Sequence, residues 1–306
     1  MVKNKVIVVL GTTASGKTKL AVALAKKFNG EIISADSRQV YRGMDIGTGK
    51  DLSEYKLKTV KILYHLIDVA DPKKQFTVAE WRQLALAAIN DIWRRGKVPI
   101  ICGGTGLYIS ALVEGYMLAA SQISNSQSQS LRRKLEQLSL KQLLARLKKI
   151  DPKTYEVIDK NNRRRVQRAL EIFYETGRPK SAQLCRQKPP YDFLLLGVTF
   201  PRPVLAERIS RRLMARLEKE GMIKEIKDLH SRGVSWRRLE DFGLEYRYIA
   251  RYLEGKISSQ EMIKQLDSAI RNFAKRQMTW FKRQKKIIWL KDKRHAAALV
   301  KSFLKY

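Results

Sequence analysis

The sequence predicts an α/β protein: a parallel β-sheet flanked by helices, with an all-helical subdomain inserted into it. Three observations lead to this prediction. Short apolar runs alternate with amphipathic helical segments in both halves of the chain, which is typical of parallel sheets. A glycine-rich loop separates the first apolar run from the first helical segment. From residue 116 to residue 190 the strand pattern stops, and apolar residues recur every three or four positions instead.

The first strand and helix enclose a phosphate-binding motif. The apolar run Val6–Leu10 leads into Gly-Thr-Thr-Ala-Ser-Gly-Lys-Thr at residues 11–18, which matches the P-loop pattern G-x-x-x-x-G-K-[ST] and predicts a P-loop NTPase-like fold. In such loops backbone N–H groups surround phosphate oxygens at a helix N-terminus. Lys17 is expected to neutralise a terminal phosphate, and Thr18 to hold Mg²⁺. The predicted phosphate ligands are Gly11, Thr13, Ala14, Ser15, Gly16, Lys17 and Thr18.

Two other strands are expected to end beside this loop. A buried strand at residues 31–35 is followed by Asp36, and a strand at residues 98–102 by a second glycine-rich turn that contains Thr105. The carboxyl ends of parallel strands face the ligand, so Asp36 should point toward whatever the P-loop holds. The second turn is compatible with a purely structural role or with an additional anion contact. Residues 38–50 show neither the apolar period of a helix nor that of a strand, which predicts a loop near the site.

The rest of the sequence predicts the other strands and helices of the core and the limits of the inserted helical subdomain. Thr77 and Glu80 have the spacing of a helix capping box. Further strands are expected at residues 64–69, 193–198 and 287–290, and helices at residues 203–229, 245–253 and 259–282. The predicted domains are a catalytic core of residues 1–115 and 191–306 and a helical insertion of residues 116–190, entered through a flexible Ser/Gln-rich hinge at residues 121–130.

The net charge indicates a polyanionic partner. Sixty-two Lys and Arg against 29 Asp and Glu give +33, which favours nucleic acid ahead of an anionic membrane surface. The basic residues are clustered at 163–168, in the ladder Arg208, Arg212 and Arg216, and at 271–286. The last cluster is interleaved with aromatic residues, a mixture suited to single-stranded RNA, although each aromatic residue taken alone fits a buried core position as well.

Cysteine, histidine and hydropathy patterns exclude several classes. Cys102 and Cys185 form no C-x-x-C pair and the three histidines are scattered, which disfavours a disulfide framework and a protein-only metal site. The N-terminal apolar run is too short for a signal peptide, and no stretch approaches membrane-spanning length. The expected compartment is the cytoplasm, with no membrane association. These features leave an ATP-driven RNA-binding protein, an RNA-directed phosphoryl transferase, and a transferase whose P-loop binds a diphosphate leaving group.

Longer motifs choose among these three. The chain resembles the tRNA dimethylallyltransferase (tRNA isopentenyltransferase) family, bacterial type, over nearly its whole length. The resemblance is carried by residues 11–18, 36–50, 103–112, 163–177 and 274–280, in order and spacing. It implies transfer of the dimethylallyl group from dimethylallyl diphosphate to N6 of adenosine 37 in the tRNA anticodon stem-loop, with release of diphosphate and with Mg²⁺ as cofactor. No protein partner is implied, and a monomer is expected.

The resemblance also implies the roles of individual residues. Asp36 is the base that accepts the amine proton, and Lys17, Thr105 and Arg208 stabilise the departing diphosphate, with Arg212 as the alternative to Arg208. The tRNA contacts are implied at Asp36, Ser37, Arg38, Gln39, Arg164, Arg165, Val166, Gln167, Arg168, Tyr246, Arg247, Lys275 and Arg276, so the insertion is expected to contact tRNA.

The chain departs from the family pattern in three places. Thr12 stands where Pro is usual, residues 244–247 read Leu-Glu-Tyr-Arg instead of Ile-Gly-Tyr-Arg, and the Ser/Gln-rich stretch replaces the usual entry to the insertion. No zinc-finger segment follows the last motif, as in bacterial members. The rival within the superfamily, an enzyme that prenylates free AMP or ADP, needs neither the basic insertion nor the motif at residues 274–280.

Overall fold

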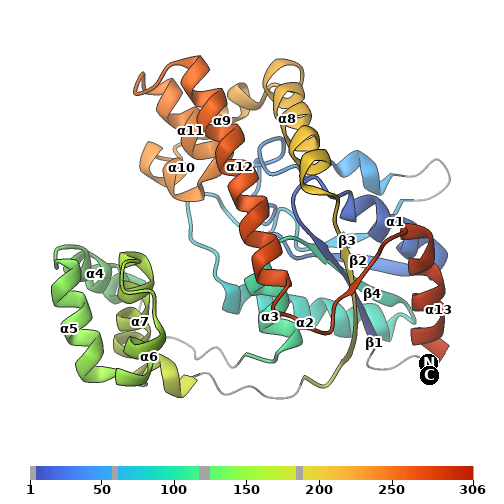
Figure 1. Ribbon diagram of the computed structural model, residues 1–306, viewed down its shortest axis with the longest axis horizontal. Coiled ribbons are helices and arrows are strands. Elements are labelled where there is room, and N and C mark those ends of the chain that lie inside the picture. The colour runs from blue at the N-terminus through green and yellow to red at the C-terminus, as the bar shows by residue number, and fades with distance from the viewer. Residues whose placement is uncertain (1–4, 57–60, 117–124, 184–188, 306) are drawn as a thin grey trace. The chain divides into compact units, whose positions relative to one another are not determined.

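The computed structural model describes residues 5–56, 61–116, 125–183 and 189–305 (Figure 1). The chain divides into two compact units. One unit is built from Met1–Val113 together with Pro190–Tyr306, and the other from Glu114–Pro189. The first contains the sheet and the second is helical.

A parallel sheet organises the larger unit, which confirms the predicted α/β class. Its described strands run in the order β3-β2-β4-β1-β5-β6, and every neighbouring pair is parallel. The strands are β1 (Lys5–Gly11), β2 (Gly30–Ser34), β3 (Tyr64–His65), β4 (Val98–Gly103), β5 (Asp192–Val198) and β6 (Ile288–Trp289). β5 follows the helical unit in sequence and pairs with β1 along its whole length, from Lys5 beside Asp192 to Gly11 beside Val198. Both parts of the core therefore share one sheet.

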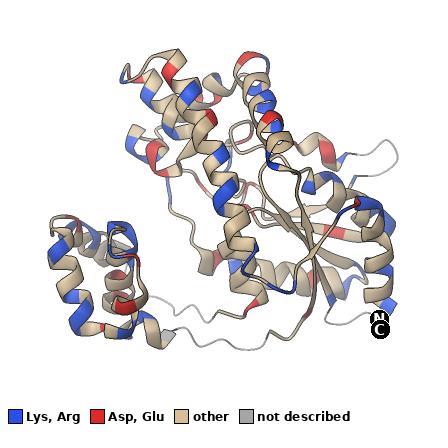
Figure 2. Cartoon of the chain, in the orientation of Figure 1, with Lys and Arg blue, Asp and Glu red and all other residues tan. Residues whose placement is uncertain are grey.

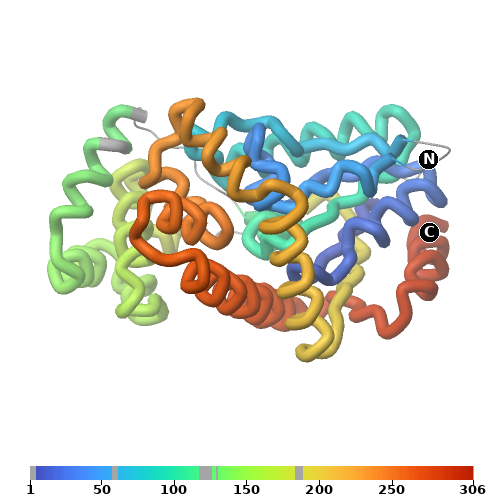
Figure 3. The backbone as a smooth tube through the Cα atoms, turned by 90° about the horizontal axis from the view of Figure 1, so that it is seen from above, coloured from blue at the N-terminus to red at the C-terminus, as the bar shows by residue number. Residues whose placement is uncertain are grey.

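The central strand β1 separates two hydrophobic layers. Val6, Val8 and Leu10 pack into one layer, while Ile7 and Val9 pack into the other, because side chains alternate between the faces of a strand. Helices α1 (Lys17–Lys27) and α13 (Ala296–Lys305) cover the second face. On the first face, α2 (Val78–Arg94) and α12 (Ser259–Phe281) contact the strands, and α3 (Gly106–Val113) packs against both helices. The same hydrophobic layer continues through α12 into α8 (Arg202–Glu218), α9 (Met222–Ser231), α10 (Trp236–Phe242) and α11 (Leu244–Leu253). Helices α8 and α12 run side by side (Figures 1 and 3).

The structure corrects several predicted boundaries. β3 is only two residues long, because Leu66 and Asp68 adopt left-handed backbone conformations (φ 60° and 58°) that a strand cannot continue through. The helix predicted over residues 203–229 is interrupted at Gly221 (φ 82°), which divides it into α8 and α9. Helices α10 and α13 lie outside every predicted range. The capping box of Thr77 and Glu80 at α2 is confirmed.

The smaller unit is a cluster of short helices around its own core. They are α4 (Asn125–Glu136), α5 (Leu140–Ile150), α6 (Pro152–Val157), α7 (Arg163–Thr176) and the 3₁₀ turn η2 (Lys180–Gln183). Leu135, Leu143, Leu147 and Leu170 form its apolar centre. The hinge predicted at residues 121–130 is wrong for residues 125–130, which are helical, and residues 121–124 lie outside the described part of the chain.

No described helix combines the length and the apolar character needed to cross a membrane.

Candidate active site

The P-loop follows β1, a central strand whose two neighbours in the sheet, β4 on one side and β5 on the other, both come later in the chain. Such a switch point is where parallel α/β sheets bind ligands. The loop turns tightly because Ala14 and Gly16 adopt left-handed conformations (φ 58° and 73°). The Thr12 carbonyl accepts hydrogen bonds from the Ser15 N–H (3.4 Å) and the Lys17 ammonium (3.3 Å), so residues 12–17 close on themselves. Thr12, which replaces the usual proline, is itself buried.

A glutamine of α12 joins the P-loop to the second glycine-rich turn. The Thr13 N–H donates to Gln277 Oε1 (2.8 Å), and Gln277 Nε2 donates to the Gly104 carbonyl (2.9 Å). A Cβ on Gly104 would lie 2.5 Å from that Nε2, so a larger residue here would displace the Gln277 amide. The buried Gln277 was not among the predicted site residues, although it lies inside the motif at residues 274–280. A polar residue on the buried face of a helix was the signal that could have identified it.

Two arginines of α8 contact the P-loop. Arg208 Nε donates to the Ala14 carbonyl at 2.8 Å, and Arg212 donates to the Thr13 hydroxyl. One turn further along, Arg216 is buried. The sequence left open whether Arg208 or Arg212 serves the phosphate site, and the structure brings both to the loop.

Three cations lie together at the loop. Among the residues that the structure describes, Lys17, Arg208 and Arg212 form no ion pair with Asp or Glu. Burial lowers the pKa of the Lys17 ammonium below its usual value. Burial and the neighbouring Arg216 lower the pKa of the Arg212 guanidinium to about 10. A protein that holds unpaired positive charges close together has a site for an anion, because the anion removes the repulsion that the ligand-free protein carries.

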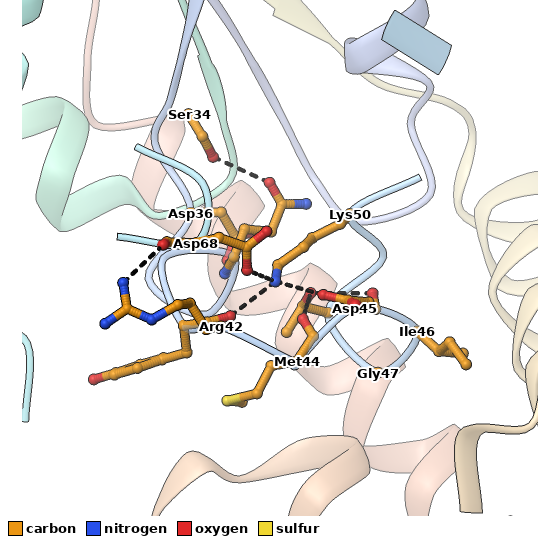
Figure 4. A network of polar contacts seen from close by, with 12 residues as sticks. Ser34, Asp36, Arg42, Met44, Asp45, Ile46, Gly47, Lys50 and Asp68 are labelled. Atoms are coloured by element: carbon orange, nitrogen blue, oxygen red, sulfur yellow. Dashed lines mark hydrogen bonds and ion pairs between the residues drawn. The ribbon is translucent and has the colours of Figure 1, made fainter. Parts of the chain in front are cut away.

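Asp36 follows β2 in a tight turn (Figure 4). Its Oδ1 accepts the N–H of Arg38 (2.9 Å) and, more weakly, of Gln39 (3.4 Å). Within the described residues no hydrogen bond reaches the other oxygen, Oδ2. The two amides orient the carboxylate while Oδ2 stays available, which is the arrangement that a proton acceptor needs.

Thr105 connects the second glycine-rich turn to the Asp36 segment. Its hydroxyl accepts the Ser37 N–H at 2.9 Å, and its own N–H donates to the Ala35 carbonyl at 3.1 Å. A Cβ on Gly103 would approach the same carbonyl within 2.2 Å. The convergence expected for the two strand ends is thus present, and Thr105 holds them together.

Lys50 organises the loop that follows Asp36. Its ammonium is almost completely buried (1% exposed) and donates to the Tyr41 carbonyl (2.8 Å), to Asp45 (2.6 Å) and to Asp68 (Figure 4). Gln39 donates to the Gly49 carbonyl (3.0 Å). A segment without helix or strand is therefore held in one conformation by a central cation and its oxygen ligands.

Glu225 of α9 holds the far end of this loop and corrects one predicted contact. Its carboxylate accepts the N–H groups of Asp45 (2.8 Å), Ile46 (2.6 Å) and Gly47 (3.1 Å). It also accepts the hydroxyl of Tyr246 (2.8 Å). Tyr246 is only 2% exposed, so its side chain has no surface with which to contact RNA, contrary to the prediction from the family motif.

The other predicted tRNA residues of this unit lie nearer the surface. The Arg38 guanidinium lies over the Phe242 ring at 5.4 Å, and Arg247 Nε donates to the Glu240 carbonyl (3.1 Å). Lys275 and Arg276 are exposed on α12, which carries Lys and Arg along much of its length (Figure 2).

In the helical unit, α7 presents part of the predicted basic face. Arg164 and Arg165 are exposed. Arg168 is exposed and paired with the buried Glu171 (2.9 Å) and Glu175 (3.2 Å). The Gln167 amide donates to Glu171 (3.1 Å). Val166 is fully buried in the core of the unit, so its side chain is not the tRNA contact that was predicted.

The oxygen donors at the P-loop suit a magnesium ion that is held mainly by a ligand's phosphates. No described group of three His, Cys, Asp or Glu side chains is arranged to bind a metal. Mg²⁺ commonly uses only one or two protein oxygens together with phosphates and water. The Thr18 hydroxyl and the Asp36 carboxylate have the required chemistry. The Thr18 hydroxyl lies beside the Cys102 thiol, whose pKa burial raises to about 12, so that this sulfur remains protonated.

Comparisons with known proteins agree on one family. The family model described as IPP transferase matches residues 39–284. The chain is 45% identical to a tRNA dimethylallyltransferase of Geotalea daltonii over 93% of its length and 90% of the relative. It is also 45% identical to one of Syntrophus aciditrophicus over 95% and 94% of the two chains.

Solved structures show the same relationship. A tRNA isopentenylpyrophosphate transferase of Bacillus halodurans is 37% identical, with a TM-score of 0.72 and coverage of 99% of this chain and 97% of that one. A eukaryotic dimethylallyltransferase described as acting on tRNA is 28% identical, with a TM-score of 0.82 over 99% of this chain and 80% of its own. On these matches of sequence and structure, the chain belongs to the IPP transferase family.

Proposed function

We propose that this chain transfers the dimethylallyl group of dimethylallyl diphosphate to N6 of adenosine 37 in the anticodon loop of tRNA. One observation supports this proposal most strongly. A P-loop with three neighbouring cations follows β1, and the oriented carboxylate of Asp36 follows β2 in the same sheet. The second glycine-rich turn is joined to the Asp36 segment through Thr105 and to the P-loop through Gln277. The reaction needs a site for the leaving diphosphate and a base for the amine proton. The chain is proposed to act as a monomer in the cytoplasm.

The P-loop side of the site would bind the diphosphate. As the allylic C–O bond breaks, negative charge accumulates on the departing diphosphate oxygens. Hydrogen bonds hold Lys17, Arg208 and Arg212 at the loop before the reaction, so these cations, together with backbone amides of the loop, would stabilise that charge. Thr105 supports this role indirectly, through its bond to the Ser37 N–H.

A magnesium ion would add to this stabilisation. Thr18 is the proposed protein ligand, and the ion when bound would supply further positive charge to the diphosphate oxygens.

Asp36 would accept the proton that the amine loses. The lone pair of an exocyclic adenine amine is delocalised into the ring, so N6 is a poor nucleophile until its proton is removed. In the proposed step the bond from N6 to the allylic carbon forms, the C–O bond to diphosphate breaks, and the N6 proton passes to the Asp36 carboxylate. The hydrogen bonds from Arg38 and Gln39 hold the carboxylate in position for this transfer.

The RNA would be bound through exposed basic residues and the Asp36 segment. Arg164, Arg165 and Arg168 of α7 and Lys275 and Arg276 of α12 are exposed cations suited to phosphate contacts. Ser37, Arg38, Gln39, Gln167 and Arg247 complete the proposed contact set. The reacting base must leave its stack to reach Asp36, as in other enzymes that modify bases.

The proposal is tested by incubating the protein with unmodified tRNA, dimethylallyl diphosphate and Mg²⁺ in the absence of ATP, followed by mass analysis of the nucleosides. N6-(dimethylallyl)adenosine is expected from tRNA. Parallel reactions with AMP or ADP in place of tRNA are expected to give no product. Prenylated AMP or ADP with unmodified tRNA would instead support the free-nucleotide enzyme. A further parallel reaction contains tRNA and ATP without dimethylallyl diphosphate, and turnover of ATP there, with no prenylated product in any reaction, would support an ATP-driven RNA-binding protein.

A further inference from the structure

A lysine near the C-terminal end of the chain reaches the P-loop. Lys293 begins the 3₁₀ turn η3 (Lys293–His295), between β6 and α13. Its ammonium donates to the Ser15 carbonyl at 3.3 Å and would lie 3.1 Å from a Cβ placed on Gly16. The match to the family model ends at residue 284, and Lys293 lies in the short run Lys291-Asp292-Lys293-Arg294, which belongs to none of the predicted motifs.

The residues before and after Lys293 in the chain are held in place, which positions Lys293. Ala296 and Val300 of α13 are fully buried in the layer that also contains β1 side chains. On the other side, the Asp292 carboxylate accepts the N–H (2.9 Å) and the guanidinium (2.6 Å) of Arg294. The nearest acid in sequence is thus engaged by Arg294, and Lys293 is directed toward the P-loop.

Lys293 and Arg208 contact the same aromatic ring. Their charged groups lie 5.1 Å and 4.6 Å from the centroid of Phe200, which follows β5. Both also donate to P-loop carbonyls, Lys293 to Ser15 and Arg208 to Ala14. Phe200 therefore places two cations, one from α8 and one from η3, at successive residues of the loop.

The charges that face Lys293 are positive. In the described portions of the chain no carboxylate forms an ion pair with it. Burial lowers the pKa of its ammonium, and Arg208 and Lys19 lower it further. Like charges that are held together by packing raise the free energy of the ligand-free protein, and a multiply charged anion at the same place would reverse that effect.

We propose that Lys293 is a further ligand of the diphosphate group, supplied to the P-loop by the segment between β6 and α13. The inference rests on the proposed function, since it adds a ligand to the same anion. A diphosphate carries more negative charge than Lys17 alone can neutralise, and Lys293 is a compact, flexible cation suited to a phosphate oxygen.

The experiment compares Lys293→Gln with Lys291→Gln. Lys291 lies two residues away and is exposed, so its replacement makes the same change of charge without touching the P-loop. Calorimetry with inorganic diphosphate and Mg²⁺ is expected to show about tenfold weaker binding for Lys293→Gln, the effect of one charged hydrogen bond. Lys291→Gln is expected to match the wild type. Affinity for tRNA at fixed salt should be equal in the two variants.

Equal diphosphate affinities in the two glutamine variants would overturn the proposal. So would a loss of tRNA affinity confined to Lys293→Gln with diphosphate binding intact, which would make Lys293 an RNA contact. Lys293→Arg keeps the charge and is expected to bind diphosphate nearly as well as the wild type, which separates loss of charge from disturbed folding; an arginine variant as weak as the glutamine variant would contradict a charge contact. A wild-type protein that binds diphosphate through Lys293 but leaves tRNA unmodified would support this inference while contradicting the proposed function.

Discussion

Gln277 of α12 accepts the N–H of Thr13 at 2.8 Å, although the two residues are 264 positions apart in the sequence. The other end of the same amide donates to the Gly104 carbonyl. One buried side chain thus sets the spacing between the P-loop and the second glycine-rich turn, and it couples both to a helix whose exposed face is basic.

Replacing Gln277 should loosen the diphosphate site. Gln277→Ala leaves the Thr13 N–H and the Gly104 carbonyl without their partner, and each such loss costs about 1–3 kcal/mol where the group stays buried. We expect a lower melting temperature and a raised KM for dimethylallyl diphosphate, measured in steady state with saturating tRNA.

Gln277→Glu is the matched control for that change. It keeps the acceptor for Thr13 but places a carboxylate oxygen against the Gly104 carbonyl, so it should also weaken the site. A glutamate variant with wild-type KM would show that the bond to Gly104 is not needed.

Removing the Asp36 carboxylate should slow transfer strongly and largely spare tRNA binding. A positioned general base contributes about 10²–10⁴-fold in rate. We expect Asp36→Asn, whose amide oxygen can still accept the Arg38 N–H, to lose about that factor in single-turnover transfer. A filter-binding assay should give nearly unchanged tRNA affinity. Residual turnover near the wild-type rate would remove Asp36 from the role of base.

Neutralising Arg212 should stabilise the ligand-free protein while weakening its function. The pKa of Arg212 lies below its unfolded value, so the charged guanidinium is disfavoured in the folded state, and at neutral pH it lowers stability. Arg212→Gln is therefore expected to raise the melting temperature without ligand and to reduce the further rise produced by diphosphate.

Arg211→Gln serves as the control for Arg212, because Arg211 is exposed and pairs with Glu207 one turn away. It should leave both melting temperatures nearly unchanged. If Arg212→Gln melted at a lower temperature than the wild type, the burial cost assigned to Arg212 would be wrong.

Affinity for tRNA should fall steeply as salt is added. Each phosphate that a Lys or Arg neutralises releases counterions, so the logarithm of affinity declines linearly with the logarithm of salt concentration. Arg164→Gln with Arg165→Gln is expected to reduce that slope by about 1–2, measured by filter binding. Lys148→Gln with Lys149→Gln on α5 removes the same charge from another helix, and an equal reduction there would mean that α7 has no special place in RNA binding.

Local sequence patterns were enough to predict many of the strands, helices and loops of this protein. The apolar period of β1 and the glycine spacing of residues 11–18 identify a strand, a phosphate loop and a helix, because these depend on neighbouring residues alone. The capping box at Thr77 and the buried strand β5 were predicted for the same reason. The longer motifs carried the resemblance to the family.

Tertiary structure decided which side chains meet. Gln277, Glu225 and Lys293 contact loops between 173 and 278 residues away, and no local period records such distances. Tyr246 and Val166 occur in the motifs that predicted tRNA contacts, yet burial turns both inward, because a helix face is chosen by what packs against it. The composition alone indicated an excess of positive charge, whereas the fold decided that part of it surrounds the P-loop, where no carboxylate of the described segments forms an ion pair with Lys17, Arg208 or Arg212.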